Sequence, residues 1–490
     1  MVRPARRLFL QERRRPVALD ASFLEALAAV LGPRGLVTDP ADLASFNAEE
    51  RGLYRGEATV VARPDSTDAC AEVVRLCATH GVSIVPQGGN TGLCGGAVAG
   101  ANQIIVSTGR MNRVRWIDAD GCRMAVDAGC VLADIQAKAR DAGCLFPLSL
   151  GAEGSCQIGG NLATNAGGVG VLHYGNTRDL CLGLEVVLPD GRIWNGMRAL
   201  EKDNTGYALR QLFIGSEGTL GLITGAVLKL FPAPTSTATA LCGFEDLSRV
   251  TRLLSLCRSI TGDDVTAFEL IPRFGLEIAL EHLDGLRDPL EGSHPWYALV
   301  ELSTSRPGAD LNEVMESLLG RAFEEEILSD AVITASLDQR ASLWRLREGL
   351  PEAQKHAGAS IKHDVSVPLS QVPTFIERAS AAVTAACPGI RPCPFGHVGD
   401  GNIHFNLTQP KGMDKQAFLD RWEEMNRLVH DIVADLGGSI SAEHGIGRLK
   451  VDEMRHYKAP LELDLMRALK TAFDPAGLMN PGVILPATTA

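Results

Sequence analysis

The sequence predicts an α+β fold with more than one domain, and three observations support this. The chain has 490 residues, which exceeds what one hydrophobic core usually serves. Its first half alternates short apolar strand candidates with glycine-rich loops, whereas long helical patterns with interspersed strands dominate the second half. Pro232 and Pro234 break regular structure between the halves. We therefore expect one domain over residues 19–233 and a second over 234–445, followed by a C-terminal helical segment over 446–490.

The elements of the first half follow from apolar spacing. Helical periodicity predicts a helix over residues 23–31, and short apolar runs predict strands over 59–61, 84–85 and 104–106. An amphipathic pattern over residues 70–79 predicts a helix between the first two of these strands. The resulting β-α-β alternation is typical of α/β and α+β domains.

An apolar run over residues 227–230 predicts the last strand before the two prolines. Beyond them, four long helical patterns predict helices that cover an antiparallel sheet. These helices are expected over residues 247–260, 311–323, 372–386 and 417–436.

Composition and charge restrict the class of protein. Hydrophobic residues make up 45% and charged residues 22%, and no apolar run approaches the roughly 18 residues of a membrane span, so we expect a soluble, cytoplasmic protein. The net charge of -12 argues against nucleic acid as a partner, because polyanion binding depends on lysine and arginine. The 12 cysteines form no C-x-x-C pair. Several lie in apolar stretches, such as Cys70, Cys77 and Cys257, which predicts reduced thiols in the core.

The first 18 residues form a basic segment in which six arginines surround the apolar run Leu8–Leu10. We interpret residues 1–18 as a basic N-terminal tail. The alternative is a mitochondrial transit peptide, for which an arginine-rich, acid-poor start is typical.

Three glycine-rich segments interrupt the first half, over residues 86–96, 151–168 and 215–221. The first has five glycines, whose backbone N–H groups can form an anion-binding nest for a pyrophosphate. Taken alone, it is equally well interpreted as a mobile surface loop. Neither G-x-x-x-x-G-K-[ST] nor a helix-opening G-x-G-x-x-G occurs, which argues against P-loop and Rossmann folds. The second segment adds side chains that can bind a polar ring or a ribityl chain: Ser155, Asn161, Thr164 and Asn165. One large extended cofactor accounts for all three segments.

Two short phrases near the C-terminal end contain three of the chain's 11 histidines and a glutamate: His397 to His404, and Glu443-His444. The glycines between His397 and His404 indicate a turn or two strand ends rather than one helix face. Imidazole and carboxylate are ligands that suit Zn²⁺ or Mn²⁺, and a further histidine can titrate near neutral pH. Structural histidines, or a metal-dependent hydrolase without redox chemistry, are the alternatives.

These segments resemble the flavoprotein family typified by vanillyl-alcohol oxidase and p-cresol methylhydroxylase, and within it the FAD-linked 2-hydroxyacid dehydrogenases. The resemblance covers about residues 40–485. It rests on five phrases: Pro86-Gln-Gly-Gly-Asn-Thr-Gly, Gly159-Gly-Asn-Leu-Ala-Thr-Asn-Ala-Gly-Gly, Gly183-Leu-Glu-Val-Val-Leu-Pro-Asp-Gly, Gly215-Ser-Glu-Gly-Thr-Leu-Gly and Asn480-Pro-Gly. It implies an FAD-binding domain of two α+β subdomains, an antiparallel-sheet substrate domain covered by helices, and a C-terminal segment that returns to the flavin.

The resemblance also implies where FAD binds. The pyrophosphate would lie over the first glycine segment, the isoalloxazine against the second, and Asn480 near the reactive edge of the flavin. Relatives with covalently bound flavin use a histidine in the first loop, which this chain lacks, so we expect dissociable FAD, with Cys156 the one candidate for a covalent link. The implied contacts are Pro86, Gly88, Gly89, Asn90, Thr91, Gly92, Leu93, Pro147, Ser155, Gly159, Gly160, Asn161, Thr164, Asn165, Gly168, Gly218, Gly221, Ile223 and Asn480.

The resemblance divides the histidine phrases into roles. His397, His404 and Glu443 would hold a divalent cation, Zn²⁺ with Mn²⁺ as the alternative, and His444 would be the catalytic base. Arg347, Lys362, Asn406 and His444 match substrate-contacting positions, although Arg347 can also be interpreted as a surface charge of a helix.

The implied reaction is oxidation of a D-2-hydroxy acid to the 2-oxo acid, with hydride transfer to flavin N5. Val398 and the Phe405-Asn406 pair favour the members that act on D-2-hydroxyglutarate, while D-lactate and glycolate remain the alternatives. Pro351 replaces a hydroxyl residue of some members, so one contact to a distal carboxylate is missing. The resemblance leaves electron-transfer flavoprotein or a quinone open as electron acceptor, and also a homodimer.

Overall fold

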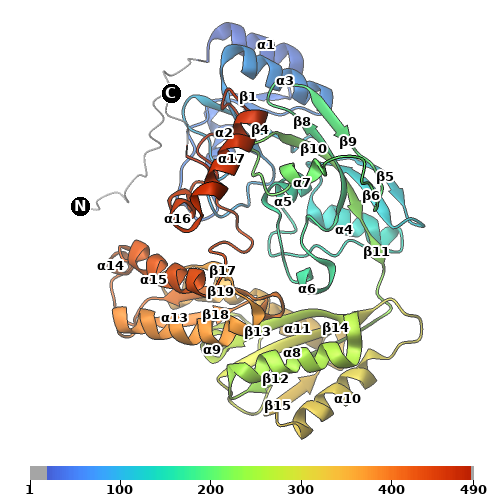
Figure 1. The fold of residues 1–490 in the computed structure, drawn as a ribbon, viewed down its shortest axis with the longest axis vertical. Coiled ribbons are helices and arrows are strands. Elements are labelled where there is room, and N and C mark those ends of the chain that lie inside the picture. The colour runs from blue at the N-terminus through green and yellow to red at the C-terminus, as the bar shows by residue number, and fades with distance from the viewer. Residues whose placement is uncertain (1–18, 487–490) are drawn as a thin grey trace.

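The structure is a computed structural model that describes residues 19–486 and divides into two halves. The first half, coloured blue to green in Figure 1, lies above the second, coloured yellow-green to orange. The predicted basic tail over residues 1–18 lies outside the described residues. Within residues 19–486 the structure has no helix that is both long and apolar enough to cross a membrane.

The first subdomain is built on a four-stranded sheet in which β2, β4 and β3 run parallel and β1 is antiparallel to β2. Its strands are β1 (Leu36–Val37), β2 (Val61–Ala62), β4 (Gln103–Ser107) and β3 (Ser83–Gln87), and its helices are α1 (Ala21–Leu31), α2 (Pro40–Asn47) and α3 (Thr67–His80). Asp20 and Ser66 cap α1 and α3 through their side chains. The predicted β-α-β alternation is therefore confirmed.

The second subdomain contains a five-stranded antiparallel sheet in the order β5-β6-β10-β8-β9. The strands are β5 (Val114–Asp118), β6 (Arg123–Asp127), β10 (Leu222–Lys229), β8 (Cys181–Val187) and β9 (Ile193–Gly196). A small ribbon of β7 and β11 lies beside it, and four helices complete the subdomain: β7 (Cys144–Leu145), β11 (Phe231–Pro232), α4 (Leu132–Asp141), α5 (Ile158–Thr164), α6 (Val171–Tyr174) and α7 (Arg210–Phe213). The second glycine segment contains α5 and the loops on both sides of it, and the third glycine segment immediately precedes β10.

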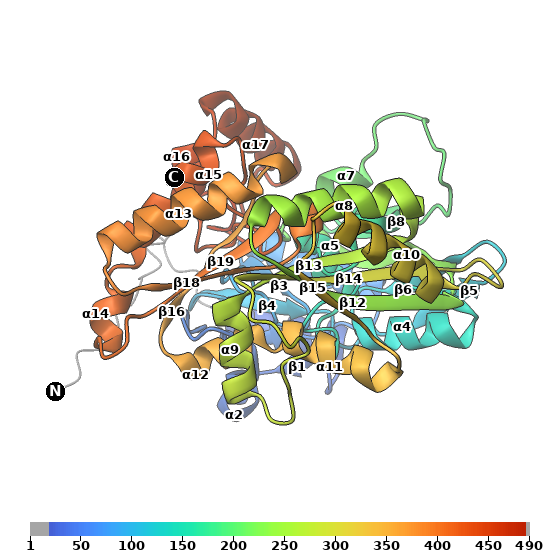
Figure 2. The same cartoon turned by 90° about the horizontal axis from the view of Figure 1, so that it is seen from below.

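The second half begins with an antiparallel sheet that has helices on both faces. Its strands, in sheet order, are β13 (Val265–Pro272), β14 (Trp296–Thr304), β12 (Ser236–Phe244) and β15 (Asp330–Ile333). Along β12, Ala240 and Cys242 pack toward α8 (Leu247–Thr261) and α10 (Leu311–Glu324), whereas Leu241 packs toward the opposite face. Figure 2 shows α8 and α10 above the sheet, and below it α9 (Arg273–His282), α11 (Leu337–Glu348) and α12 (Leu350–Ala357).

A smaller sheet in the second half positions the histidines. Strand β19 (Asn402–Thr408) pairs antiparallel with β16 (Ser360–Ile361), β17 (Asp364–Ser366) and β18 (Arg391–Phe395). An antiparallel bridge between Leu270 and Gly396 connects this sheet to the larger one. Helices α13 (Val372–Ala386) and α15 (Trp422–Asp435) pack against it through buried apolar side chains. The expected antiparallel sheet covered by helices is therefore present.

One predicted helix is divided in two. Residues 417–436 were expected to form a single helix, but α14 (Lys415–Leu419) ends before Asp420 and α15 starts at Trp422. Arg421 lies between them, and its guanidinium bonds to Ala386 O at 2.8 Å and to Glu424. These tertiary contacts are absent from the apolar pattern, so the prediction of one continuous helix was wrong.

The C-terminal segment returns to the first half. Helices α16 (Val451–Tyr457) and α17 (Pro460–Phe473), red in Figure 1, lie against the blue and green part of the molecule. Met479 then pairs in parallel with Ile84 of β3, and Asn480 N donates to Ile84 O at 2.8 Å. The chain end thereby extends the first sheet beside the first glycine segment.

Candidate active site

His397 lies just after one strand and His404 lies within the next, and a tight turn joins them. His397 follows β18, the short helix at Val398–Asp400 comes next, and His404 lies within β19. Gly401 ends the turn with φ of 84°, a conformation that suits glycine. The expected arrangement, a turn between strand ends, is confirmed.

Asp364 is a central residue that the sequence reasoning did not assign. It lies on β17 opposite His404 and is 2% exposed. Its Oδ2 accepts hydrogen bonds from the backbone N–H groups of Glu443 and His444, both at 2.9 Å, and its Oδ1 accepts one from Asn402 Nδ2 at 3.0 Å. Although burial opposes its charge, the electrostatic effects of His444 and Lys450 hold the pKa of Asp364 well below its usual range. Asp364 therefore fixes the turn that carries Glu443 and the third histidine of the cluster, His444.

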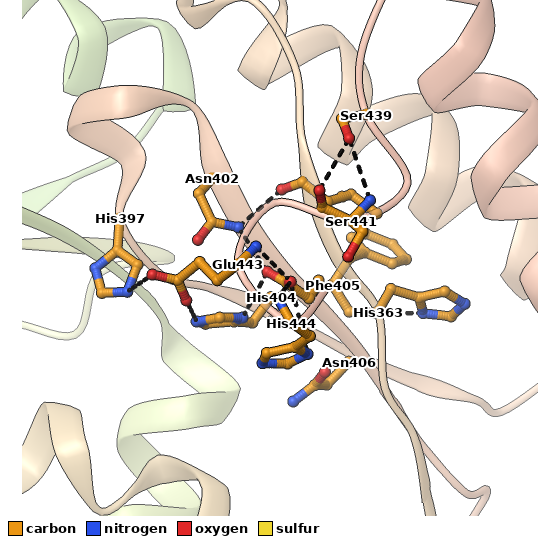
Figure 3. Close-up of polar contacts among 12 residues, drawn as sticks. His363, His397, Asn402, His404, Phe405, Asn406, Ser439, Ser441, Glu443 and His444 are labelled. Atoms are coloured by element: carbon orange, nitrogen blue, oxygen red, sulfur yellow. Dashed lines mark hydrogen bonds and ion pairs between the residues drawn. The ribbon is translucent and has the colours of Figure 1, made fainter. Parts of the chain in front are cut away.

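His397 and His404 each have one ring nitrogen that faces a buried carboxylate. His397 Nδ1 lies 2.6 Å from Glu269 Oε1 of β13, and His404 Nδ1 lies 3.7 Å from Asp364 Oδ1. The other ring nitrogens point to Glu443: His397 Nε2 is 3.8 Å from Oε1 and His404 Nε2 is 3.9 Å from Oε2 (Figure 3). A carboxylate behind the outer nitrogen is a recurrent feature of metal-binding histidines. The donor set of two imidazoles and one carboxylate fits a divalent ion.

A second grouping of ligand atoms overlaps this one. Atoms of Asp364, His404, Glu443 and His444 all lie within 4.8 Å of one another. However, both oxygens of Asp364 already accept hydrogen bonds, and His444 Nδ1 lies 3.6 Å from Asp364 Oδ2. Asp364 therefore acts as the support of the neighbouring residues, which leaves His397 as the better third donor beside His404 and Glu443.

Burial and carboxylates give the histidines different protonation states. Burial lowers the pKa of His404 to about 3 and that of His444 to about 4, against the opposing charge of Asp364. Burial also disfavours the charged form of His397, but Glu269 and Glu443 outweigh it and raise the pKa of His397 to about 9. Burial raises the pKa of the Glu443 carboxyl. His404 and His444 are therefore neutral at pH 7, as a ligand or a proton acceptor must be.

A cavity lies between the three glycine segments. It is lined by most of the predicted FAD contacts: Pro86, Gly88, Gly89, Asn90, Thr91, Gly92, Leu93, Gly159, Gly160, Asn161, Thr164, Gly218, Gly221, Ile223 and Asn480. His444 lines the same cavity. Ser155, Asn165 and Gly168 are not among its lining residues, and Pro147 lines a different cavity. The cavity and the histidine cluster therefore meet at His444.

The cavity also has lining residues that the sequence reasoning missed, among them Thr108, Gln157 and Glu217. Thr108 Oγ1 donates to Gln157 Oε1 at 2.8 Å, which connects the end of β4 in the first subdomain to the start of α5 in the second. None of these residues stands out in the sequence, because their positions depend on contacts between distant segments. Glu217 was part of the quoted Gly215-Ser-Glu-Gly phrase, which was the available signal.

The residues of the cavity fit a polar extended cofactor. The buried side-chain oxygens of Asn161 and Asn480 have no hydrogen-bond partner in the described structure, so each can accept from a ligand. The backbone is packed closely, since a Cβ on Gly218 would lie 2.8 Å from the Pro86 ring, and Gly218 has φ of 71°. Asn480 Nδ2 meanwhile donates to Gly96 O at 2.9 Å and Glu217 O at 2.8 Å. The cavity therefore combines backbone that only glycine permits with free polar acceptors.

The turn after Glu443 docks on the FAD-binding half. Glu217 accepts hydrogen bonds from Ile446 N and Gly447 N, both at 2.8 Å. On the other side of the turn, a Cβ on Gly167 of the second glycine segment would lie 2.5 Å from Glu443 Oε1. The histidine cluster is thus held against the flavin cavity by close contacts rather than by a linker.

The three other predicted substrate contacts differ in their surroundings. Arg347 is buried, its Nε donates to Glu269 Oε2 at 2.6 Å and its guanidinium lies over the Phe395 ring, so the alternative of a surface charge was wrong. Asn406 Nδ2 donates to Gln354 Oε1 at 2.7 Å. Lys362 makes no hydrogen bond or ion pair with any residue of the described range 19–486. Burial, with Arg51 and Lys355, lowers the pKa of Lys362 to about 8.

Two family models and a solved structure match this chain. A model for a FAD binding domain matches residues 58–196, and a model for the C-terminal domain of FAD linked oxidases matches residues 233–484, more than half of the chain. The substrate-bound structure of p-cresol methylhydroxylase matches with a TM-score of 0.72 over 95% of this chain and 96% of that chain, at 16% identity. This last likeness concerns the fold alone.

Relatives are similar over nearly the whole chain. The mitochondrial D-2-hydroxyglutarate dehydrogenase of Bos taurus is 38% identical over 465 residues, which covers 94% of this chain and 83% of the relative. That of Arabidopsis thaliana is 35% identical over 471 residues, covering 96% and 82%. A protein provisionally named as a mitochondrial D-lactate dehydrogenase of Schizosaccharomyces pombe is 37% identical over 455 residues, covering 91% and 85%. The chain therefore belongs to the FAD-linked oxidase family of flavoproteins and is an FAD-dependent oxidoreductase related to the D-2-hydroxyglutarate dehydrogenases.

Proposed function

We propose that this protein is an FAD- and divalent-metal-dependent dehydrogenase that oxidises D-2-hydroxyglutarate to 2-oxoglutarate. One observation carries the proposal: His444 lines the flavin cavity, while the neighbouring Glu443 lies between two histidine Nε2 atoms. A base, a candidate ion site and the cofactor cavity are therefore contiguous. The names of the Bos taurus and Arabidopsis relatives support the choice of substrate. Membership of a flavin oxidoreductase family removes the competing interpretation of a non-redox hydrolase.

Two groups supply chemistry that no side chain of the chain provides. Bound FAD accepts the α-hydrogen of the substrate as a hydride, and a divalent ion lowers the pKa of a coordinated hydroxyl and orients it. His397, His404 and Glu443 would hold the ion. Glu269 and Asp364, which face the outer nitrogens of the histidines, would orient those ligands. His397 would release its proton on binding the ion, since the carboxylates of Glu269 and Glu443 raise its pKa to about 9.

His444 would take the hydroxyl proton of the substrate. Its Nδ1 lies 3.6 Å from Asp364 Oδ2, which favours a proton on Nδ1 and leaves Nε2 as the acceptor. Burial lowers the pKa of His444 to about 4, so the imidazole is neutral at pH 7. Asp364 also holds the backbone of His444 through a hydrogen bond of 2.9 Å. The carboxylate of Asp364 would then stabilise the imidazolium that forms.

Arg347 and Lys362 would bind carboxylates of the substrate. Only Nε of Arg347 is hydrogen-bonded within the described range, so its terminal nitrogens remain available. Lys362 has no counter-ion there, and its depressed pKa reflects burial and neighbouring cations, conditions that an anion relieves. Asn406 would contribute a polar contact, although its Nδ2 is bonded to Gln354.

The FAD is proposed to be dissociable. Cys156 is the one candidate nucleophile for a covalent link, but its side chain is 2% exposed and burial raises the pKa of its thiol. Acid precipitation of the purified protein should leave all yellow colour in the supernatant. Colour in the pellet would show a covalent flavin.

The electron acceptor, the compartment and the assembly belong to the same proposal. We propose electron-transfer flavoprotein or a quinone as acceptor. The names of the relatives favour the mitochondrial alternative over the predicted cytoplasmic location, and cell fractionation distinguishes them. Light scattering during gel filtration tests the predicted homodimer.

The substrate is tested by reducing the flavin anaerobically with D-2-hydroxyglutarate, D-lactate and glycolate in separate experiments. Bound flavin absorbs near roughly 450 nm, and loss of this band reports hydride transfer directly. We expect the highest second-order rate constant with D-2-hydroxyglutarate. D-lactate is the second candidate, because one relative is provisionally named for it. An equal or higher rate constant with D-lactate would overturn the assignment.

The metal is tested independently of the substrate. Dialysis against a chelator should abolish turnover while the flavin stays bound, and Zn²⁺ or Mn²⁺ should restore it. Glu443→Gln is expected to lower metal content, measured by mass spectrometry, in parallel with activity. Full turnover after metal removal would refute the role of the ion and leave the flavin chemistry intact.

A further inference from the structure

Two carboxylates, one from each half of the chain, hold the turn over residues 443–447. From the substrate half, Asp364 Oδ2 accepts hydrogen bonds from the N–H groups of the first two residues of this turn, both at 2.9 Å. From the FAD-binding half, the carboxylate of Glu217 accepts hydrogen bonds from the N–H groups of the last two, both at 2.8 Å. The second residue of the turn is His444, so the proposed base is fixed from both halves at once.

The Glu217 carboxylate packs directly against the middle of the turn. A Cβ on Gly445 would lie 2.7 Å from Glu217 Oε1, and Gly445 has φ of 73°. Glycine is therefore required there by both the contact and the backbone conformation. Because Gly445 directly follows His444 in the chain, a shift of the carboxylate moves the backbone next to the proposed base.

The backbone of Glu217 has a conformation that glycine adopts more easily. Its φ is 50°, in the left-handed region, and Gly215 and Gly218 of the same segment also have positive φ, of 79° and 71°. A residue with a side chain is strained in this region, and such strain is frequent at functional sites. A glycine would relieve the strain, so what this position provides is the carboxylate.

Glu217 also belongs to the flavin cavity. It lines that cavity together with His444 and Asn480. Its backbone N donates to Ala163 O of the second glycine segment at 2.8 Å, and its backbone O accepts from Asn480 Nδ2 at 2.8 Å. The main chain of Glu217 is thus bonded to segments that are expected to surround the flavin, while its side chain is bonded to the turn that carries the base.

We propose that Glu217 is a positioning residue that fixes His444 relative to the flavin. This inference rests on the proposed function and gives the FAD-binding half a part in placing the base. The base must meet the substrate hydroxyl while the α-hydrogen points at the flavin, and a displacement of about 1 Å can lower a rate about 100-fold. Asp364 connects the turn to the half that holds the candidate ion site, and Glu217 connects it to the half that binds the flavin.

Two competing roles for Glu217 differ in what a substitution changes. A purely structural contact between the halves would alter the stability of the fold but not the rate at which bound flavin is reduced. A direct contact with FAD would alter retention of the cofactor. A positioning role instead lowers the rate of hydride transfer per bound flavin and leaves substrate binding nearly unchanged.

The test compares Glu217→Gln and Glu217→Asp with a matched control, Glu201→Gln. The glutamine has only one acceptor oxygen, so one of the two backbone N–H groups loses its acceptor. Glu201 is an exposed glutamate of the same half, so its substitution makes the same change in charge away from the site. Anaerobic reduction by D-2-hydroxyglutarate in a stopped-flow instrument gives a limiting rate constant per bound flavin and an apparent Kd. For Glu217→Gln we expect the rate constant to fall about 10- to 100-fold and Kd to change by no more than about threefold.

Hydrogen exchange provides a readout that does not depend on turnover. The N–H groups of residues 446 and 447 donate to Glu217, so peptides that cover them should exchange faster in Glu217→Gln than in the unmodified protein. In Glu201→Gln the same peptides should exchange as in the unmodified protein. Unchanged exchange in Glu217→Gln would show that the carboxylate does not hold the turn, which overturns the inference.

The variants separate the remaining outcomes. Glu217→Asp keeps the charge on a shorter side chain, so its rate constant should lie between those of the unmodified protein and Glu217→Gln. An unchanged rate constant per bound flavin in Glu217→Gln overturns the inference, even if that variant melts earlier or loses FAD on gel filtration. Should Glu217→Gln fail to fold, an unchanged rate constant in Glu217→Asp decides against the inference. An unmodified protein whose flavin is reduced by no 2-hydroxy acid refutes the proposed function itself, and the inference with it.

Discussion

Burial and buried carboxylates together set the protonation state of the three histidines in the site. Glu269 faces His397, and Asp364 faces both His404 and His444. The balance between burial and these carboxylates differs from residue to residue. The carboxylates of Glu269 and Glu443 raise the pKa of His397 to about 9, whereas burial lowers the pKa of His444 to about 4. Residues of one type therefore suit the different roles proposed for them: His397 would be a ligand that must lose a proton, and His444 a base that is already neutral.

Lys362 provides a prediction about pH at the residue scale. Burial, with Arg51 and Lys355, lowers its pKa to about 8. The ammonium is charged below that pH and neutral above it, so its attraction for a carboxylate is lost as pH rises through about 8. We expect kcat/KM for D-2-hydroxyglutarate to fall on the alkaline side through a rise in KM. The matched variant Lys362→Arg keeps its charge, so its kcat/KM should not fall in this alkaline range. The same alkaline limb in Lys362→Arg would assign the titration to another group.

At the level of structural elements, the turn after Glu443 packs closely against two of the glycine segments. The turn after Glu443 lies against the second glycine segment at Gly167 and against the third at Glu217, which accepts two of its backbone N–H groups. The second and third segments line the flavin cavity from the other side. The same two segments therefore contribute to the cavity and also contact the turn after Glu443.

Gly167→Ala tests this contact. The new Cβ would lie 2.5 Å from Glu443 Oε1, so the carboxylate must move away from the two histidines. We expect turnover to fall about tenfold or more, in the range seen when the support of a metal ligand is disturbed, with FAD content unchanged. Gly151→Ala is the matched control, because it changes a glycine of the same segment and its Cβ meets nothing within 4 Å. Equal activity of the two variants would show that the contact is unimportant.

At the level of the whole molecule, the C-terminal segment returns to the first half and is held there by polar contacts. Lys470 of α17 donates to Thr219 O and Met479 O, both at 2.7 Å, and to Asp474 Oδ2 at 2.6 Å. Asp474 is 2% exposed and also accepts from the backbone of Leu478 and Met479. This cluster holds the C-terminal segment beside the third glycine segment and places Asn480 in the flavin cavity.

Lys470→Met should weaken that connection. It leaves the buried carboxylate of Asp474 without its cation, and such a change typically lowers the free energy of unfolding by about 3 kcal/mol. We expect a lower melting temperature and faster FAD release, followed by flavin fluorescence during heating. Lys458→Met is the control, since its ion pair with Glu462 is half-exposed and such pairs contribute about 1 kcal/mol or less. If both variants release FAD equally, the C-terminal segment does not secure the cofactor.

Several parts of the molecule could be predicted from the sequence alone. Local sequence patterns predicted the β-α-β opening, helices α8, α10 and α13, and the turn between His397 and His404. These predictions succeeded because each of these elements depends on residues that are neighbours in the sequence. The glycine segments indicated a cofactor for the same reason, since the freedom of glycine is a local property. The domain boundaries and the roles of the site residues stay predictions.

Other features were decided by the tertiary structure. Asp364 gains its importance only because β17 pairs with β19, and Glu217 only because the turn after Glu443 meets the third glycine segment. The break between α14 and α15 depends on a contact of Arg421 with α13. The sequence by itself determined which residues can bind a flavin, an ion and a proton. The tertiary structure decided which of them share one site, because burial, strand pairing and the return of the chain end act between residues far apart in the chain.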